Sequence, residues 1–137
     1  MRIFIDTSSL LKKYYLEEGS AKVLKIFKKT TEVVVSPITY IELYNTLQRL
    51  FTEKKLPKKD FLTLLQDIHS DFQFFQKVSW DHQLENACVT LINKYTLKSL
   101  DCIQLASAKS SECEHFVTSD HKQHQIAARE FKKAILM

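Results

Sequence analysis

The chain has 137 residues, 45% of them hydrophobic, which is enough for one well-filled core and too few for two ordinary domains, so we predict a single domain over residues 1–137. Its 20 Lys and Arg against 16 Asp and Glu leave a formal net charge of +4, a mild excess that favours a polyanionic partner without requiring one. With Gly19 as its single glycine, the chain has neither a GxGxxG dinucleotide loop nor a Walker-type phosphate loop.

The first half of the chain alternates short apolar runs with helical patterns. The runs Ile3–Ile5 and Val33–Val35 predict two buried strands. Apolar residues at helical spacing lie between them, and the glycine predicts a break there between two helices. Pro37 is typical of a first helical position, so we predict a long helix that begins there, with Ser36 as its N-cap, and ends near Lys54.

The second half of the chain repeats this alternation. Pro57 and Asp81 each precede a helical pattern, a third helix is predicted from near Ser99, and a final helix precedes the closing AILM sequence. Short strands are predicted at residues 74–78, 116–117 and 134–137. Strands that alternate with helices predict an α/β fold with a central, mostly parallel sheet, because parallel strands need crossover connections.

Four carboxylates stand where such a sheet would gather them at one edge. Asp6 and Asp120 follow predicted strands, while Glu42 and Asp101 lie in the first turn or two of predicted helices. Ligands of parallel sheets bind beyond the carboxyl ends of the strands. We therefore expect these four acids, far apart in sequence, to meet in one site.

A cluster of carboxylates needs something to offset its repulsion. Two of them about 4 Å apart repel by roughly 4 kcal/mol at an effective dielectric constant of about 20. A raised pKa, lysine partners or a bound cation would each reduce this repulsion, and all-oxygen sites with several acids suit Mg²⁺ or Mn²⁺ best. Such an ion activates water and polarises phosphoryl oxygens, so the sequence predicts phosphodiester hydrolysis.

Each acid taken alone has a simpler interpretation. Asp6 is a possible N-cap of a helix beginning near Ser8, and Asp120 a possible turn or cap residue. Asp101 is a possible first-turn acid that the helix dipole favours. Glu42 is harder to explain in this way, because it lies on the polar face of its predicted helix.

A zinc site is a competing hypothesis. Cys113 and His115 form C-x-H, and His121 and His124 form H-x-x-H, but these residues lie on either side of a predicted strand and lack a spacing with known mechanics. Serine or cysteine triad chemistry has less support, because the chain contains no G-x-S-x-G nucleophile elbow.

The compartment follows from three features of the sequence. The N-terminal MRIFIDTSS has no apolar core of a signal peptide, and no stretch approaches about 18 uncharged apolar residues. Cys88, Cys102 and Cys113 cannot all pair and form no CxxC, as expected of reduced, mostly buried thiols. We therefore expect a cytoplasmic protein.

Four segments, taken in order, resemble one known family. They are IDTSSLL after the first predicted strand, YIEL with Glu42, KYTLKSLDCIQLASA with Asp101 and FVTSD with Asp120. Together they resemble the PIN-domain ribonucleases, particularly the VapC-like toxins of prokaryotic toxin–antitoxin pairs, over essentially the whole chain. The resemblance implies a PIN-like three-layer α/β/α sandwich, with endonucleolytic cleavage of RNA as its activity.

The same resemblance implies a role for each acid. All four would bind Mg²⁺ or Mn²⁺, and Asp6 and Asp101 would be the principal ligands. Asp120 would be a ligand often acting through water, and Glu42 a ligand or the group that orients the attacking water. The resemblance further implies a homodimer and inhibition by a small protein antitoxin.

Other polar and basic residues enter as secondary candidates. Ser8 and Thr118 resemble accessory positions that hydrogen-bond the carboxylates, although many family members have Asn in place of Ser8, and Lys98 stands where Arg is frequent. His121, directly after Asp120, is a hypothesis for tuning that carboxylate or touching phosphate. The candidates for contacts with the RNA backbone are Arg49, Lys12, Lys13 and Lys122.

Two other functional hypotheses stay open. In one, the chain is a non-catalytic PIN-like RNA- or protein-binding module, although such a module has no need for mutually repelling carboxylates. In the other, lysines neutralise a purely structural acid cluster, and Mn²⁺ would then not stabilise the protein.

Overall fold

The computed structural model describes residues 1–131 and 133–137, and it confirms the predicted α/β fold with a parallel sheet. Its strands are β1 (Arg2–Ile5), β2 (Glu32–Val35), β3 (Gln76–Lys77), β4 (His115–Thr118) and β5 (Ala134–Leu136). They form one five-stranded sheet in the order β3-β2-β1-β4-β5, and every pairing is parallel. The predicted strand in the closing AILM sequence is confirmed as the edge strand β5.

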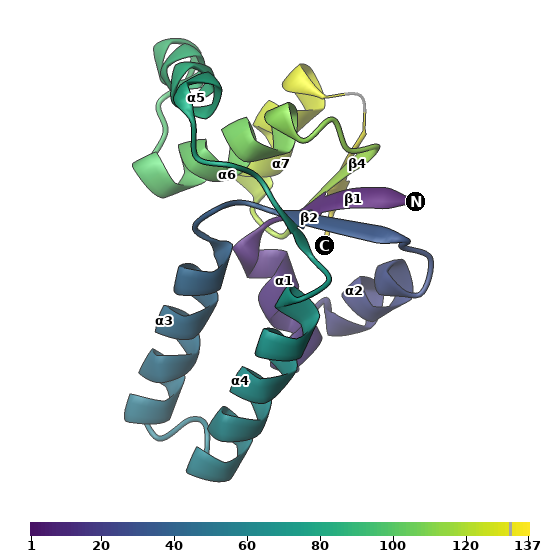
Figure 1. The fold of residues 1–137 in the computed structure, drawn as a ribbon, viewed down its shortest axis with the longest axis vertical. Helices are drawn as coiled ribbons and strands as arrows, with labels where there is room; N and C mark the ends of the chain where they lie inside the picture. The colour runs from purple at the N-terminus through teal and green to yellow at the C-terminus, as the bar shows by residue number, and fades with distance from the viewer. Residues whose placement is uncertain (132) are drawn as a thin grey trace.

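Helices cover both faces of this sheet, as a three-layer α/β/α sandwich requires. They are α1 (Thr7–Tyr14), α2 (Ser20–Phe27), α3 (Thr39–Thr52), α4 (Lys58–Phe72), α5 (His82–Lys94), α6 (Ser99–Ser110) and α7 (His121–Glu130). In Figure 1, α1 to α4 lie on one side of the sheet and α5 to α7 on the other, with α3 and α4 extending away as a pair. No helix among the described residues is long and apolar enough to cross a membrane.

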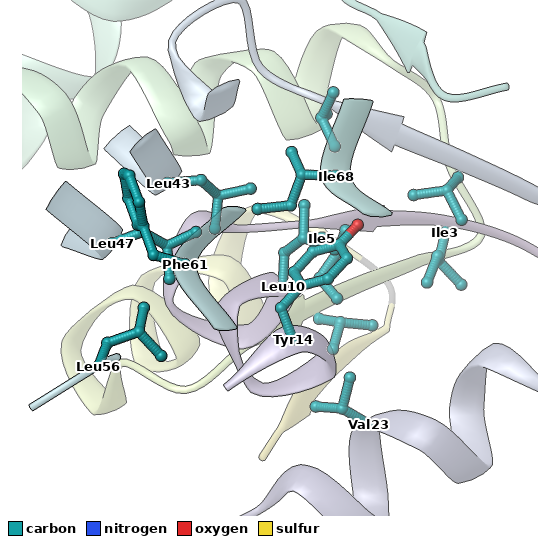
Figure 2. Close-up of a cluster of buried hydrophobic side chains, with 13 residues drawn as sticks. Ile3, Ile5, Leu10, Tyr14, Val23, Leu43, Leu47, Leu56, Phe61 and Ile68 are labelled. Atoms are coloured by element: carbon teal, nitrogen blue, oxygen red, sulfur yellow. The ribbon is translucent and has the colours of Figure 1, made fainter. Parts of the chain in front are cut away.

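The sheet has a hydrophobic core on each face, and alternate residues of the strands contribute to one core or the other. Ile3 and Ile5 point to the layer of α1 to α4, whereas Phe4 between them points to the layer of α5 to α7. Figure 2 shows the first core, where Leu43 of α3 and Ile68 of α4 approach the strand residues. Because side chains alternate along a strand and both faces are covered, the central strands β1 and β2 are apolar after their first residue, as their sequence predicts, whereas the short edge strand β3 is polar and exposed.

The predicted start of the long helix is wrong by two residues. α3 begins at Thr39, not at Pro37, and residues 37 and 38 form a turn. The Ser36 hydroxyl accepts a hydrogen bond from the backbone N–H of Ile38 at 3.2 Å and lies 3.0 Å from the Thr39 hydroxyl. Ser36 therefore stabilises this turn, and the helix begins where the turn ends. The strand predicted at residues 74–78 is present but short, as β3.

The three cysteines are free thiols with a structural role for two of them. The Cys102 thiol donates to the Cys88 carbonyl at 3.2 Å and joins α6 to α5. Burial raises the pKa of Cys102 to about 12, so its reactive thiolate form is suppressed. Of the three, only Cys102 is fully buried, while Cys88 and Cys113 are half-buried.

The sheet order creates one special edge. β1 pairs with β2 on one side and with β4 on the other, so the chain winds away from β1 in opposite directions. Ile5 stands beside Val117, and the backbone N–H of Asp6 donates to the Val117 carbonyl at 3.0 Å. Asp6 and the residues after β4 therefore meet at a topological switch point, where open α/β sheets place their ligand sites.

Candidate functional site

A small polar cleft opens at the carboxyl ends of β1 and β4. Its volume is about 110 Å³. The residues that line it include all four predicted acids and come from the β1 and β4 ends and the helices α1, α3, α6 and α7: Asp6, Thr7, Ser8, Glu42, Asp101, Gln104, Asp120 and Gln123. The structure thus brings together carboxylates separated by up to 114 positions in the sequence (6 to 120).

Asp6 is the most deeply buried of these acids, with 2% of its surface exposed. Its carboxylate accepts hydrogen bonds from the Ser9 backbone N–H at 2.8 Å, from the Ser8 hydroxyl at 3.0 Å and from the Thr118 hydroxyl. Burial outweighs these hydrogen bonds and raises the pKa of Asp6 to about 6. Asp6 is therefore both the predicted N-cap, here of α1, and a wall of the cleft.

Glu42 is held by neutral donors on one of its two carboxylate oxygens. The Thr7 hydroxyl and the Gln104 side-chain amide each donate to Oε1 at 2.7 Å. The Gln104 amide also donates to the Thr7 hydroxyl at 2.8 Å, which closes a triangle of hydrogen bonds. The orientation of the Glu42 carboxylate is thus fixed by contacts from α1 and α6.

Gln123 performs a similar task for the other two acids. Its side-chain amide donates to Oδ1 of Asp101 at 3.1 Å, and its backbone N–H donates to Oδ1 of Asp120 at 2.8 Å. The second contact makes Asp120 the N-cap of α7, as one simpler interpretation predicted. Thr118 joins the two strand-end acids, because its hydroxyl donates to Asp6 and accepts from the Asp120 backbone N–H at 3.0 Å.

Besides the hydroxyls of Ser8 and Thr118, which the family resemblance indicated, three residues that were not predicted from the sequence surround the acids. Thr7, Gln104 and Gln123 contact the acids directly. The two glutamines had a detectable signal, because each stands three residues after an acid at the start of a helix. Residues three apart share a helix face, so these glutamines belong to the polar face of the site.

Lysine partners do not explain the acid cluster. Among the described residues, no lysine or arginine nitrogen lies within 4.0 Å of the four acids, and the ion pairs found join other residues. The neighbours of the acids are hydroxyl, amide and backbone N–H groups, which carry no net charge. The hypothesis of a lysine-neutralised structural cluster is therefore wrong for the part of the chain that the structure describes.

The arrangement differs from a closed metal cage. Over residues 1–131 and 133–137, no three His, Cys, Asp or Glu side chains are clustered closely enough to hold an ion as they stand. The carboxylates instead turn toward neutral donors around the cleft, as mutually repelling groups do. Their donor atoms are all oxygens, and this chemistry fits Mg²⁺ or Mn²⁺.

The zinc hypothesis fails on position. Cys113 lies before β4 and His115 is its first residue, whereas His121 and His124 lie beyond its end in α7. A four-residue strand spans roughly 10 Å, which is far longer than the distance between ligands of one zinc ion. These four residues accordingly form no metal-binding group.

The basic residues proposed to contact RNA differ in whether their side chains already have partners within the protein. Lys12 donates to the Glu17 carboxylate at 3.1 Å, and Lys13 pairs with Asp71. Lys122 donates to the carbonyl of residue 96. Arg49 lies exposed in the last turn of α3 and pairs with no acid among the described residues. It is therefore the candidate with the most freedom to reach a phosphate.

Several solved structures share this fold. The FitAcB structure from Neisseria gonorrhoeae aligns with a TM-score of 0.71 at 16% identity, covering 98% of this chain and 96% of that one. The VapC20 structure from Mycobacterium tuberculosis, a toxin described as cleaving the sarcin–ricin loop, aligns with a TM-score of 0.67 at 15% identity, covering 95% and 97%. A toxin–antitoxin complex from Klebsiella pneumoniae aligns with a TM-score of 0.66 at 19% identity, covering 88% of each chain.

Identities this low establish a shared fold alone, and no curated protein sequence matches the chain. The family assignment rests on a separate finding. The family model of the PIN domain matches residues 3–129, which include all four acids, β2 to β4 and all but the first residue of β1. The chain therefore belongs to the PIN domain family.

Proposed function

We propose that this PIN domain is a divalent-metal-dependent endoribonuclease that hydrolyses RNA phosphodiester bonds. One observation carries the proposal: four carboxylates line a single cleft at the switch point of the sheet, and neutral donors surround them instead of lysines. Because no lysine or arginine among the described residues pairs with these acids, their negative charge would attract a metal ion. The mild net charge of +4 on the whole chain is compatible with a polyanionic substrate.

Each acid would have its own role in binding the metal ion or the attacking water. Asp6 and Asp101, from a strand end and a helix, would hold the ion directly, and Asp120 would hold it through water. Glu42, with Oε1 fixed by Thr7 and Gln104, would offer Oε2 to the metal or to the attacking water. When bound, Mg²⁺ or Mn²⁺ supplies Lewis-acid chemistry, which lowers the pKa of a bound water and polarises a phosphoryl oxygen.

The biological role we propose is that of a toxin in a toxin–antitoxin pair. The supporting observation is that the neighbours in fold include a toxin–antitoxin complex and VapC20, a toxin described as cleaving the sarcin–ricin loop. A protein antitoxin would then restrain the enzyme in the cytoplasm, and the enzyme would act as a homodimer.

Cleavage of a mixed cellular RNA pool tests the proposed activity. The purified protein, freed of any bound partner, is incubated with Mn²⁺ or Mg²⁺ beside Asp101→Asn. The matched control is Asp60→Asn, because Asp60 is also a first-turn helix acid but lies exposed on α4, away from the cleft. We expect the parent and the control to cut RNA, and we expect chelator or Asp101→Asn to abolish cutting.

The contrary result is equally clear. If Asp101→Asn cuts as well as the parent, Asp101 is not needed for cleavage and its assignment to the site is wrong. If the folded parent cuts no RNA with either metal, the proposed nuclease itself is wrong. The non-catalytic binding module would then be the better description, and RNA binding without cleavage would be its signature.

A further inference from the structure

Gln104 is one of the residues that line the cleft. Its side chain lies on α6 with 3% of its surface exposed. The amide nitrogen Nε2 donates to Oε1 of Glu42 at 2.7 Å and to the Thr7 hydroxyl at 2.8 Å. It also lies 3.4 Å from the hydroxyl of Thr39, at the start of α3. One carboxamide thus joins three helices at the position of one acid.

The other end of the same carboxamide is unusual. Its oxygen, Oε1, is buried and has no hydrogen-bond partner among the described residues. Turning the amide over would place this oxygen against the Glu42 carboxylate, so the hydrogen bonds fix the orientation with the nitrogen toward the acid. A buried acceptor without a donor destabilises a fold. If Gln104 only filled space in the core, an apolar side chain of similar length, such as methionine, would pack there without leaving a buried oxygen unpaired.

We propose that Gln104 is a positioning residue that holds the Glu42 carboxylate ready for the metal ion, an inference that rests on the proposed function. Two neutral donors, from Gln104 and Thr7, occupy Oε1 of Glu42 and leave Oε2 to the cleft. Because neither donor is charged, the carboxylate keeps the negative charge that attracts a cation. A lysine at the same place would orient the carboxylate but also neutralise it.

Gln123 provides a matched comparison inside the same cleft. It is also buried, with 5% exposure, and its side-chain oxygen also lacks a partner among the described residues. Its amide, however, contacts Asp101 and not Glu42. A substitution of Gln123 therefore removes the same chemical group from the same site without touching the proposed route through Glu42.

The experiment is a double-mutant cycle read out in two ways. Gln104→Met is made in the parent and in the Glu42→Ala background, and Gln123→Met is made in both as the control. Mn²⁺ affinity is measured by titration calorimetry without RNA, and kcat and KM are measured with an RNA substrate. If Gln104 acts through Glu42, its effect disappears once Glu42 is absent, because coupled residues are not additive.

We expect Gln104→Met in the parent to weaken Mn²⁺ binding or lower kcat by about 10- to 100-fold, the range found for groups that orient metal ligands, with KM for RNA unchanged. In the Glu42→Ala background the same change should have no further effect. Gln123→Met should remain harmful in both backgrounds. Gln104→Asn keeps the carboxamide but is one methylene too short to reach Glu42, so it should repeat the loss and replaces the methionine variant if that does not fold.

Three outcomes would contradict the inference in different ways. Unchanged Mn²⁺ affinity and kcat in both Gln104 variants would show that the residue positions nothing. An equal loss with and without Glu42 would assign Gln104 to the stability of the helix packing. A parent that neither binds Mn²⁺ nor cuts RNA would overturn the proposed function itself, and this inference with it.

Discussion

The two sides of the cleft hold their acids in different ways. On the strand side, Asp6 is 2% exposed and is fixed by the Thr118 hydroxyl at the end of β4 and by the Ser8 hydroxyl and Ser9 backbone N–H in the first turn of α1. On the helix side, Glu42 and Asp101 are partly exposed, and the carboxamides of buried glutamines hold them. The first arrangement depends on the ends of β1 and β4 and the first turn of α1, and the second on contacts between helices.

The two sides of the cleft should contribute differently to folding stability and to activity. Burial raises the pKa of Asp6 to about 6, so its ionised form is disfavoured by the fold that surrounds it. Glu42 and Asp101 are partly exposed, so burial disfavours their ionised forms less. We therefore expect substitutions on the strand side to change both folding stability and activity, and substitutions of the helix-side acids to change mainly activity.

The largest expected effect is the loss of RNA cleavage in Asp6→Asn. A group that only orients a ligand contributes about 10- to 100-fold, so removal of a principal ligand should lower kcat/KM by at least about 100-fold. Asp81→Asn is the control, because Asp81 caps α5 through the Leu84 N–H at 2.9 Å as Asp6 caps α1. Cleavage at the parental rate by Asp6→Asn would remove Asp6 from the site.

The same substitution should also change how the folding stability depends on pH. The pKa of Asp6 is about 6 in the folded protein against an ordinary value of 3.8, so the folded state binds the proton more tightly than the unfolded state. The metal-free parent should therefore lose stability as pH rises from about 4 through about 6, by on the order of 3 kcal/mol. Asp6→Asn should lack this loss and be the more stable protein at pH 7.5.

Urea unfolding at several pH values, with chelator present, measures this difference. Mn²⁺ should restore stability to the parent at neutral pH and leave Asp6→Asn unchanged, because only a bound ligand stabilises the folded state. Parallel pH profiles for the two proteins would contradict the assignment of the raised pKa to Asp6.

The strand side is also the part of the site that the sequence predicts best. Apolar runs such as Ile3–Ile5 are typical of buried strands, and parallel strands must end at one edge, so the meeting of Asp6 and Asp120 follows from local patterns. Thr118 and Ser8 were named through the family resemblance, and both donate hydrogen bonds to Asp6. The turn at Ser36 was missed, since the serine stabilises a turn before α3 and not the helix itself.

The helix side could not be predicted to the same depth. Gln104 meets Glu42 across 62 positions of sequence, and their contact depends on how α3 and α6 pack against the sheet. No local pattern encodes that packing. The acids themselves were found because four carboxylates repel one another and need a common explanation, whereas a glutamine in an apolar helix has many ordinary explanations.

A smaller effect is expected from Thr118→Val, which removes a donor from the buried Asp6 carboxylate. The loss should destabilise the protein by about 1–3 kcal/mol at pH 8, where the carboxylate is ionised. The loss should be smaller at pH 4.5, because the protonated acid depends less on that donor. Thermal unfolding at the two pH values measures it, with Thr63→Val as the control, since Thr63 is exposed and its hydroxyl donates to a carbonyl of its own helix, α4. Equal destabilisation at both pH values would assign Thr118 a packing role alone.

The smallest effect should lie outside both sides of the cleft. Arg49→Gln, at the exposed end of α3, should weaken RNA binding a few-fold and reduce the salt dependence of log Kd by about 0.7, the value for one phosphate contact on a single strand. Binding is measured in the Asp101→Asn background, so that the RNA stays intact. Lys12→Gln is the control, because Lys12 is already paired with Glu17 and should change the slope less. A larger slope change for Lys12 would place the RNA backbone beside α1, near the strand side of the cleft, instead of beside α3.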